Sequence, residues 1–150
     1  MNEWATTRRA PGEVHFTSGE VLQGDMHLQY RQGIPGNTET PLEMLNRDEA
    51  FFALTLGDDA VRLVAKSQVV TVALGNTRYD EGPAPAQHQT FSVHLANGRD
   101  FEGDVHIVLP PPATRGIDFL NQPEPFFALH AADGLWCLNR HHVCHVRPHD

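Results

Sequence analysis

The sequence has few cysteines, little positive charge and no long apolar run. Cys137 and Cys144 are the two cysteines among 150 residues, and one pair is too few for a disulfide framework. Aspartate and glutamate number 19 against 11 lysines and arginines, so the formal net charge is −8. Both halves are acidic, with 6 basic against 10 acidic residues in 1–75 and 5 against 9 in 76–150. The missing basic excess disfavours nucleic-acid binding, which depends on neutralising phosphates.

No apolar segment approaches the roughly 20 residues of a transmembrane helix, so no membrane partner is expected. The first residues, MNEWATTRRAPGE, lack the apolar core of a signal peptide. We therefore expect a soluble cytoplasmic protein with reduced thiols.

The chain contains an internal repeat in three blocks. In the first block, Val14, Gly19, Gly24, Asp25 and His27 match Val93, Gly98, Gly103, Asp104 and His106, each 79 positions later. In the second, 42–46 and 51–54 match 117–121 and 126–129 at a spacing of 75. In the third, 61–72 matches 135–146 at a spacing of 74. The spacing shrinks where loops are expected, since loops tolerate changes of length, and a repeat this long predicts two domains of one type.

The repeat sets the predicted domain boundaries. They are an N-terminal lead over 1–12, a first domain over 13–74, a linker over 75–90, a second domain over 91–147 and a tail over 148–150. Glycine and proline in the linker disfavour helix and sheet there. Domains this small bury only about 60% of the surface of their unfolded chains, so we expect them to pack against each other or against further copies.

Each repeat has the pattern of a hairpin, a short helix and further strands. Apolar residues alternate on both sides of Gly19, which predicts two strands around a tight turn. Gly24 in the return strand predicts a bulge or bend. Thr40 can cap a helix that begins at Pro41. The predicted fold is mainly β, with two tandem SH3-like five-stranded small barrels, each with a short helix inserted between its strands 2 and 3.

The second repeat resembles the Sm-like family. Residues 91–105 are similar to its first signature, in which apolar residues flank two glycines spaced as Gly98 and Gly103 are. Residues 135–146, with Arg140 in a polar-basic turn, are similar to its second signature, and Ala65-Lys66 stands at the same place in the first repeat. The resemblance implies small barrels that pair their edge strands into rings.

Two departures from the family pattern lie at its RNA contacts. A proline-rich segment and a helix replace the loop that carries the family's Asp and Asn, and Ser67 and His141 replace the glycine of the second signature. RNA binding by the family's route is therefore disfavoured. The residues of 109–111, 118–121 and 126–129 are also similar to uncharacterised bacterial proteins with an LPP…DFLN…FFAL pattern, a likeness that implies no activity.

The C-terminal segment is rich in potential metal ligands, namely Cys137, His141, His142, Cys144, His145 and His149. Imidazole and thiolate favour zinc and copper, so a zinc site on His141, His142 and His145 is one interpretation. The other is packing, because Cys137 and Cys144 align with the apolar Leu63 and Val70, and a buried cysteine behaves as a small hydrophobe. We favour packing and expect no cofactor.

Other polar residues carry weaker signals. Four histidines, His15, His27, His94 and His106, recur in both repeats at outward strand positions, as a strand surface or as a pH-sensing interface. Lys66, Arg140 and His142, at the last turn of each repeat, are candidate contacts for a partner. No arrangement typical of a nucleophile or a phosphate loop is present, so catalysis is not expected.

The leading functional prediction is a non-enzymatic interaction or assembly module that pairs with itself or with another protein through edge strands. Metal binding by the C-terminal cluster and RNA binding are the alternatives. The repeats also differ, since Trp136 and Cys144 replace Arg62 and Val70. That difference predicts that one face of the second repeat is more buried or more contacted.

Overall fold

A computed structural model describes residues 8–30, 37–77, 79, 87–109 and 115–149. The first half contains β1 (Arg8–Phe16), β2 (Val21–Leu28), α1 (Pro41–Leu45), β3 (Phe51–Leu56), β4 (Val61–Ala65), the 3-10 turn η2 (Lys66–Gln68) and β5 (Val69–Gly75). The second half contains β6 (Gln87–Leu95), β7 (Asp100–Ile107), α2 (Gly116–Leu120), β8 (Phe126–Ala131), β9 (Gly134–Asn139), the 3-10 turn η3 (Arg140–His142) and β10 (Val143–Pro148). The order of elements is therefore the same in both halves.

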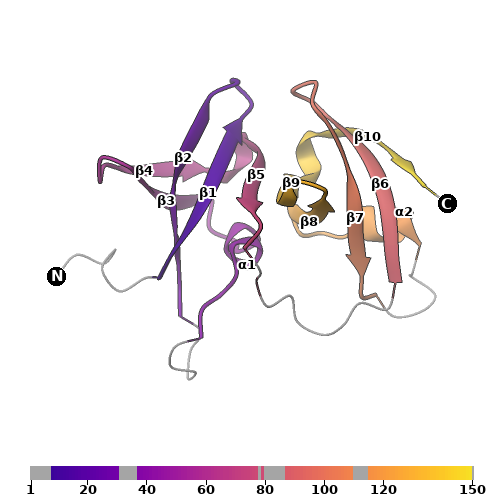
Figure 1. Cartoon of the computed structure of the whole chain (residues 1–150), viewed down its shortest axis with the longest axis horizontal. Coiled ribbons are helices and arrows are strands. Elements are labelled where there is room, and N and C mark those ends of the chain that lie inside the picture. The colour runs from indigo at the N-terminus through magenta and orange to yellow at the C-terminus, as the bar shows by residue number, and fades with distance from the viewer. Residues whose placement is uncertain (1–7, 31–36, 78, 80–86, 110–114, 150) are drawn as a thin grey trace.

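All the strands belong to one antiparallel sheet, in the order β10-β6-β7-β8-β9-β5-β1-β2-β3-β4. Within each half the strands follow the same spatial order, so β5-β1-β2-β3-β4 corresponds to β10-β6-β7-β8-β9. The halves join where β5 pairs with β9. β4 and β10 are left at the two ends of the sheet, on opposite sides of the molecule (Figure 1).

The mainly β class and the position of both helices are confirmed, but the two closed barrels are not found. Closing the first barrel would require hydrogen bonds between β5 and β4. Instead β5 pairs with β1 on one side and with β9 on the other, where Val72 lies opposite Cys137. The second edge of β5 is therefore occupied by the other half, and the ten-stranded sheet stays open.

The first strand of each half begins earlier than predicted. Residues 8–12, assigned to a loose lead, belong to β1, and residues 87–90, assigned to the linker, belong to β6. Pro11 lies opposite Asp25 on β2, whereas β5 pairs with β1 only from Glu13 onward. A residue without an N–H is tolerated there because that side of β1 has no strand neighbour.

Glycines account for the hairpin turns and for a close approach of strands. Gly19 and Gly98 have φ of 90° and 86°, which favours glycine in both tight turns. Gly24 does not mark a bulge. A Cβ there would lie 2.5 Å from the carbonyl oxygen of Thr55, so glycine lets β2 and β3 approach each other. Gly103 has the same relation to His130.

The helix α1 begins as the sequence predicts, with Pro41 at its first position. The Thr40 hydroxyl accepts a hydrogen bond from the Glu43 N–H (3.2 Å), and the Glu43 carboxylate accepts one from the Thr40 N–H (3.1 Å). This reciprocal capping fixes the start of a helix of only five residues. Met44 and Leu45 on α1 are fully buried.

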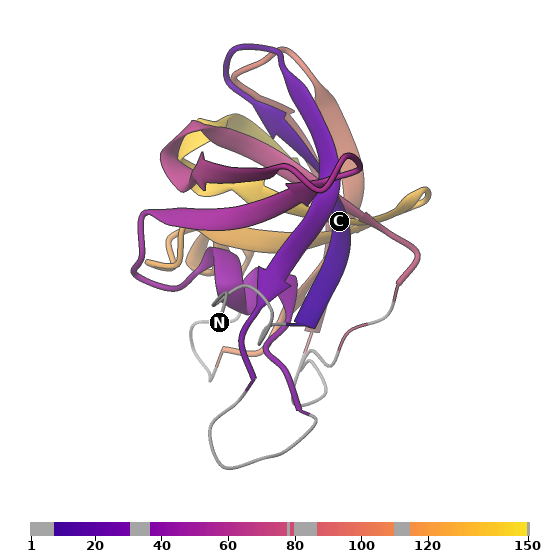
Figure 2. The same ribbon diagram turned by 90° about the vertical axis from the view of Figure 1, so that its left-hand side faces the viewer.

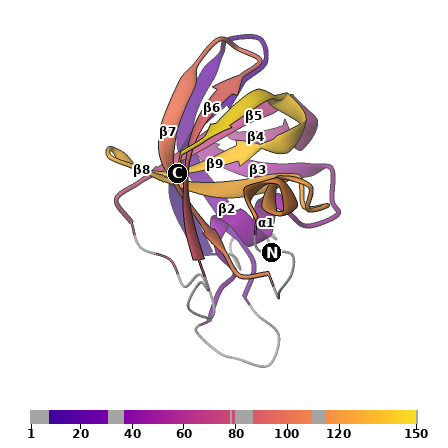
Figure 3. The same ribbon diagram turned by 90° about the vertical axis from the view of Figure 1, so that its right-hand side faces the viewer.

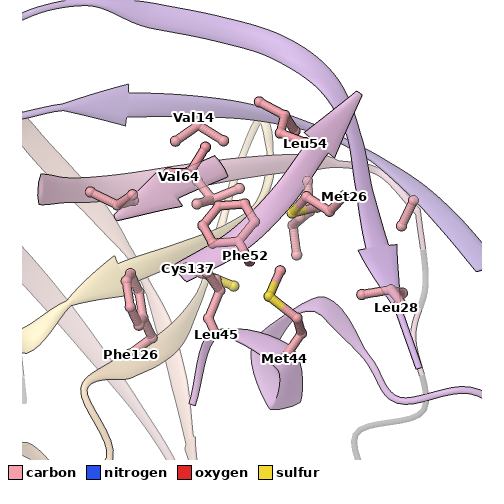
Figure 4. Packing of buried hydrophobic residues seen from close by; sticks show 14 residues of the cluster. Val14, Met26, Leu28, Met44, Leu45, Phe52, Leu54, Val64, Phe126 and Cys137 are labelled. Carbon is pink, nitrogen blue, oxygen red and sulfur yellow. The ribbon is translucent and has the colours of Figure 1, made fainter. Parts of the chain in front are cut away.

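Two apolar clusters form the core, and each contains residues from the opposite half. Cluster 1 is built on β1–β5 and α1 but includes Phe126 and Cys137 of the second half (Figure 4). Cluster 2 is built on β6–β10 but includes Val70 of the first half. Because side chains cross the β5–β9 junction in both directions, each half completes the core of the other.

Candidate interaction surfaces

The β5–β9 junction inside the chain defines how one half binds the other. Phe126 at the start of β8 is 1% exposed and Cys137 on β9 is 0% exposed, and both pack into cluster 1. Cys137 lies among Leu45, Met44 and Phe52, and Phe126 lies on the other side of Leu45 (Figure 4). Cys137 therefore has the apolar packing role that its alignment with Leu63 predicted, while Cys144 is exposed, and neither cysteine is part of a disulfide.

A side-chain clamp accompanies this packing. Asn46 caps the C-terminal end of α1, and its amide faces the first residue of β8. The Asn46 Nδ2 donates to the Phe126 carbonyl (3.1 Å), and the Phe126 N–H donates to Asn46 Oδ1 (2.8 Å). One side chain thus satisfies both main-chain groups of Phe126 across the junction.

The turns η2 and η3 also meet at the junction. The Asn139 amide donates to the Val69 carbonyl (2.9 Å), and a nitrogen of His142 lies 2.8 Å from the Ser67 carbonyl oxygen. His142, a predicted partner contact, thus lies between the two halves of the chain itself. The junction therefore combines a strand pair, the buried side chains of Phe126 and Cys137, and polar contacts at the end where β5 begins and β9 ends.

At the β3–β4 end of the sheet, the residues equivalent to Phe126 and Cys137 are exposed. Phe51 is equivalent to Phe126 and is 58% exposed, and Leu63 is equivalent to Cys137 and is 64% exposed. Val61 beside them is also exposed. Figure 2 turns this end of the molecule toward the viewer. An apolar group next to an unpaired strand edge is typical of a protein interaction site.

At the opposite end of the sheet, the apolar residues of α2 and β10 are incompletely buried. Four residues of α1 and β5, Met44, Leu45, Val69 and Val72, are fully buried in cluster 1, to which the second half adds Phe126 and Cys137. Their equivalents on α2 and β10, Phe119, Leu120, Val143 and Val146, are only partly buried against cluster 2. Figure 3 views this end, with β10 in yellow. Cluster 2 therefore has no counterpart of Phe126 and Cys137, the two side chains that the other half contributes to cluster 1, among the residues that the structure describes.

The structure places the two predicted basic contacts at helix ends. Lys66 is buried, and its Nζ donates to the carbonyls of Met44 (2.8 Å) and Arg47 (3.1 Å) at the end of α1. Arg140 donates to the carbonyls of Phe119 (2.9 Å) and Leu120 (3.2 Å) at the end of α2. Burial lowers the pKa of both groups. Both cations donate to carbonyls at the C-terminal end of a helix, where a positive charge is favourable.

The structure does not bring the three predicted metal ligands together. His141 and His142 lie on η3, whereas His145 lies on β10 and stacks on His94 with ring centroids 4.7 Å apart. Within the described ranges, no group of three or more His, Cys, Asp or Glu side chains is arranged to hold a metal ion.

Two of the four repeated histidines are buried, contrary to the prediction of an outward surface. His15 lies at the junction, where a ring nitrogen is 3.3 Å from an Arg99 guanidinium nitrogen and the ring lies 5.7 Å from that of Trp136. His27 is covered by β3, with a ring nitrogen 2.6 Å from the Thr55 hydroxyl. Burial lowers the pKa of His27. The alternation of the strand residues did not predict that the second half covers His15 or that β3 covers His27.

The most informative surface residues, Phe51, Leu63 and Asn121, were missed by the sequence reasoning. The repeat aligns them with Phe126, Cys137 and Asn46, but the aligned residues are identical or alike in character, and only their exposure in the structure separates a covered face from an uncovered one. Among the described helices, none is long and apolar enough to cross a membrane. Comparison of the chain with protein-family models, curated proteins and solved structures yields no match.

Proposed function

We propose that this chain is a non-enzymatic assembly module in which the β10–α2 end of one copy binds the β3–β4 end of the next. The observation that carries the proposal is the contrast at equivalent positions, with Phe126 and Cys137 buried and Phe51 and Leu63 58% and 64% exposed. The first pair completes a core inside the chain, and the second pair is available to complete a core in another chain.

The proposal treats the two halves as copies of one duplicated unit, related to the Sm-like small barrels that the sequence resembles. The same spatial order of strands in both halves supports this equivalence. So does the matching role of Lys66 and Arg140 at the two helix ends. Under this equivalence the β5–β9 junction serves as the template for the contact between chains.

The template specifies a register. Inside the chain, Val72 lies opposite Cys137. The equivalent contact between chains places Val146 of one copy opposite Leu63 of the next, with the strands antiparallel. Leu63 then faces the partly buried residues of cluster 2, as Cys137 faces cluster 1.

The geometry of the chain makes this contact head-to-tail. The β4 and β10 edges lie on opposite sides of the molecule, so they cannot pair within one chain (Figure 1). A contact between two different surfaces is heterologous, and it generates either a closed ring or an open filament. Every interface in the assembly would be the same.

The test is the variant Leu63→Asp, with Val21→Asp as the matched control. Val21 is also exposed, at 45%, but it lies on β2 away from the open edge. Sedimentation velocity over a concentration series should give an assembly for the wild type and for Val21→Asp, and a monomer for Leu63→Asp. A wild-type chain that stays monomeric at high concentration, or an assembly that survives Leu63→Asp, would contradict the proposal.

A further inference from the structure

We infer that Asn121 is a recognition residue that clamps the main chain of Phe51 in the next copy. The inference rests on the proposed assembly and assigns a binding role to a residue outside both strand edges. The supporting observation is the Asn46–Phe126 contact, in which the equivalent residues are already hydrogen-bonded within one chain.

Asn121 occupies the position on α2 that Asn46 occupies on α1. It caps the C-terminal end of its helix, with its N–H donating to the Ile117 carbonyl (3.1 Å), as the Asn46 N–H donates to the Leu42 carbonyl (3.0 Å). Asn121 is exposed. Over the parts of the chain that are described, no hydrogen bond joins its side-chain amide to another residue. The main chain of Asn121 is therefore fixed at the helix end, and its exposed side chain can reach a partner.

The main chain of Phe51 is presented in the way the clamp requires. The Lys66 N–H donates to the Ala50 carbonyl (2.9 Å), so Phe51 falls at the next, non-hydrogen-bonded position of the β3–β4 ladder. Along an antiparallel pair these positions alternate, and the N–H and C=O of Phe51 consequently point away from β4. The Arg140 N–H makes the same bond to the Pro125 carbonyl (2.7 Å) beside Phe126.

The apolar surroundings of the clamp match on both sides. In the internal contact the ring of Phe126 lies beside Leu45 of α1, within cluster 1. α1 buries three of its residues, whereas α2 buries none. Phe119 and Leu120 of α2 are half-buried against cluster 2, and Phe51 is the exposed aromatic group that would cover them. Docking thus brings α2 to the burial that α1 already has.

An asparagine is suited to this role because its amide carries a donor and an acceptor on one group. It can bond the C=O and the N–H of one residue only when that residue is in register. A slip of one residue would turn the main-chain groups of β3 away from the helix end. The clamp therefore selects a partner that offers this edge in one register, and another copy of this chain offers it.

The test compares Asn121→Ala with Asn97→Ala, an exposed asparagine in the turn between β6 and β7. Asn121→Ala should weaken association about 25-fold, because two hydrogen bonds are lost and each typically contributes roughly a factor of five. Asn121→Asp keeps the acceptor but loses the donor, so its affinity should lie between that of the wild type and that of Asn121→Ala. The thermal midpoint of the dilute monomer should be unchanged in Asn121→Ala but lowered in Asn46→Ala, since only Asn46 is engaged within the chain.

Hydrogen exchange separates the clamp from the assembly itself. The Phe51 amide proton should exchange more slowly on assembly in the wild type and not in Asn121→Ala. If Leu63→Asp abolishes assembly while Asn121→Ala leaves both affinity and Phe51 exchange unchanged, the clamp is wrong and the assembly stands. If Leu63→Asp has no effect, the assembly is wrong and the clamp with it.

Discussion

Reversing the charge of Arg62 should tighten the assembly. Inside the chain, Ala73 on β5 lies opposite Trp136 on β9. The equivalent positions between chains are Arg147 and Arg62, both exposed. The docking register therefore places two positive charges directly opposite each other, and such a pair is destabilising.

The size of the effect follows from the change of sign. An opposite-charge pair across two strands contributes roughly 0.2–1 kcal/mol, and a like-charge pair opposes by a similar amount. Arg62→Glu replaces repulsion with attraction, a change of about 0.4–2 kcal/mol per interface. This corresponds to roughly a two- to thirtyfold lower Kd. Since both side chains are exposed, salt should screen the effect.

The assay is sedimentation velocity on Arg62→Glu, Arg147→Glu and the double variant, at low and high salt. Each single variant should associate more tightly than the wild type at low salt. The double variant, with two glutamates opposite each other, should lose that gain. A wild-type assembly that strengthens with salt would agree with the register. Single variants that weaken association, or a double variant as tight as the single ones, would refute it.

Two further predictions concern the fold. Phe126→Ala should lower the free energy of unfolding by about 3–5 kcal/mol, because it leaves a cavity in cluster 1. The substitution of its exposed equivalent, Phe51→Ala, should change the free energy of unfolding of the monomer by less than about 0.5 kcal/mol. Urea unfolding of dilute protein measures both values, and equal effects would contradict the assignment of the two surfaces. His27 is the source of a pH dependence, since burial lowers its pKa from the ordinary 6.5. The unfolded chain then binds a proton first as the pH falls below about 6.5, so stability is lost between that pH and the lower folded-state pKa. His27→Gln should flatten this part of the stability profile, and an unchanged profile would count against the buried histidine as its cause.

The sequence predicted what local patterns control. The alternation around Gly19, the cap formed by Thr40 and the apolar burial of Cys137 all follow from neighbouring residues or from direct alignment of the repeats. The helices between the second and third strands of each half were found for the same reason. These features do not depend on what the other half does.

What the sequence did not predict arises where the two halves meet. Barrel closure failed because the second edge of β5 pairs with β9, a contact between residues about 65 positions apart that no local pattern specifies. His15 was expected at the surface and is buried because the second half covers it. Lys66 became a helix cap because α1 ends beside it. The expected extra burial of the second half is found at Trp136, whereas Cys144 is exposed.

The most direct test of the assembly is a cross-link between chains at the proposed register. One chain carries Leu63→Cys and Cys144→Ser, and a second chain carries Val146→Cys and Cys144→Ser, so that the buried Cys137 is the one natural thiol left. Residues directly opposite across two strands have Cα atoms about 4.5–5.5 Å apart, which suits a disulfide. Mild oxidation of the mixture should give a dimer of one chain of each kind on a non-reducing gel, and little product from either chain alone. No mixed dimer, or equal cross-linking of either chain with itself, would contradict head-to-tail docking of β10 on β4.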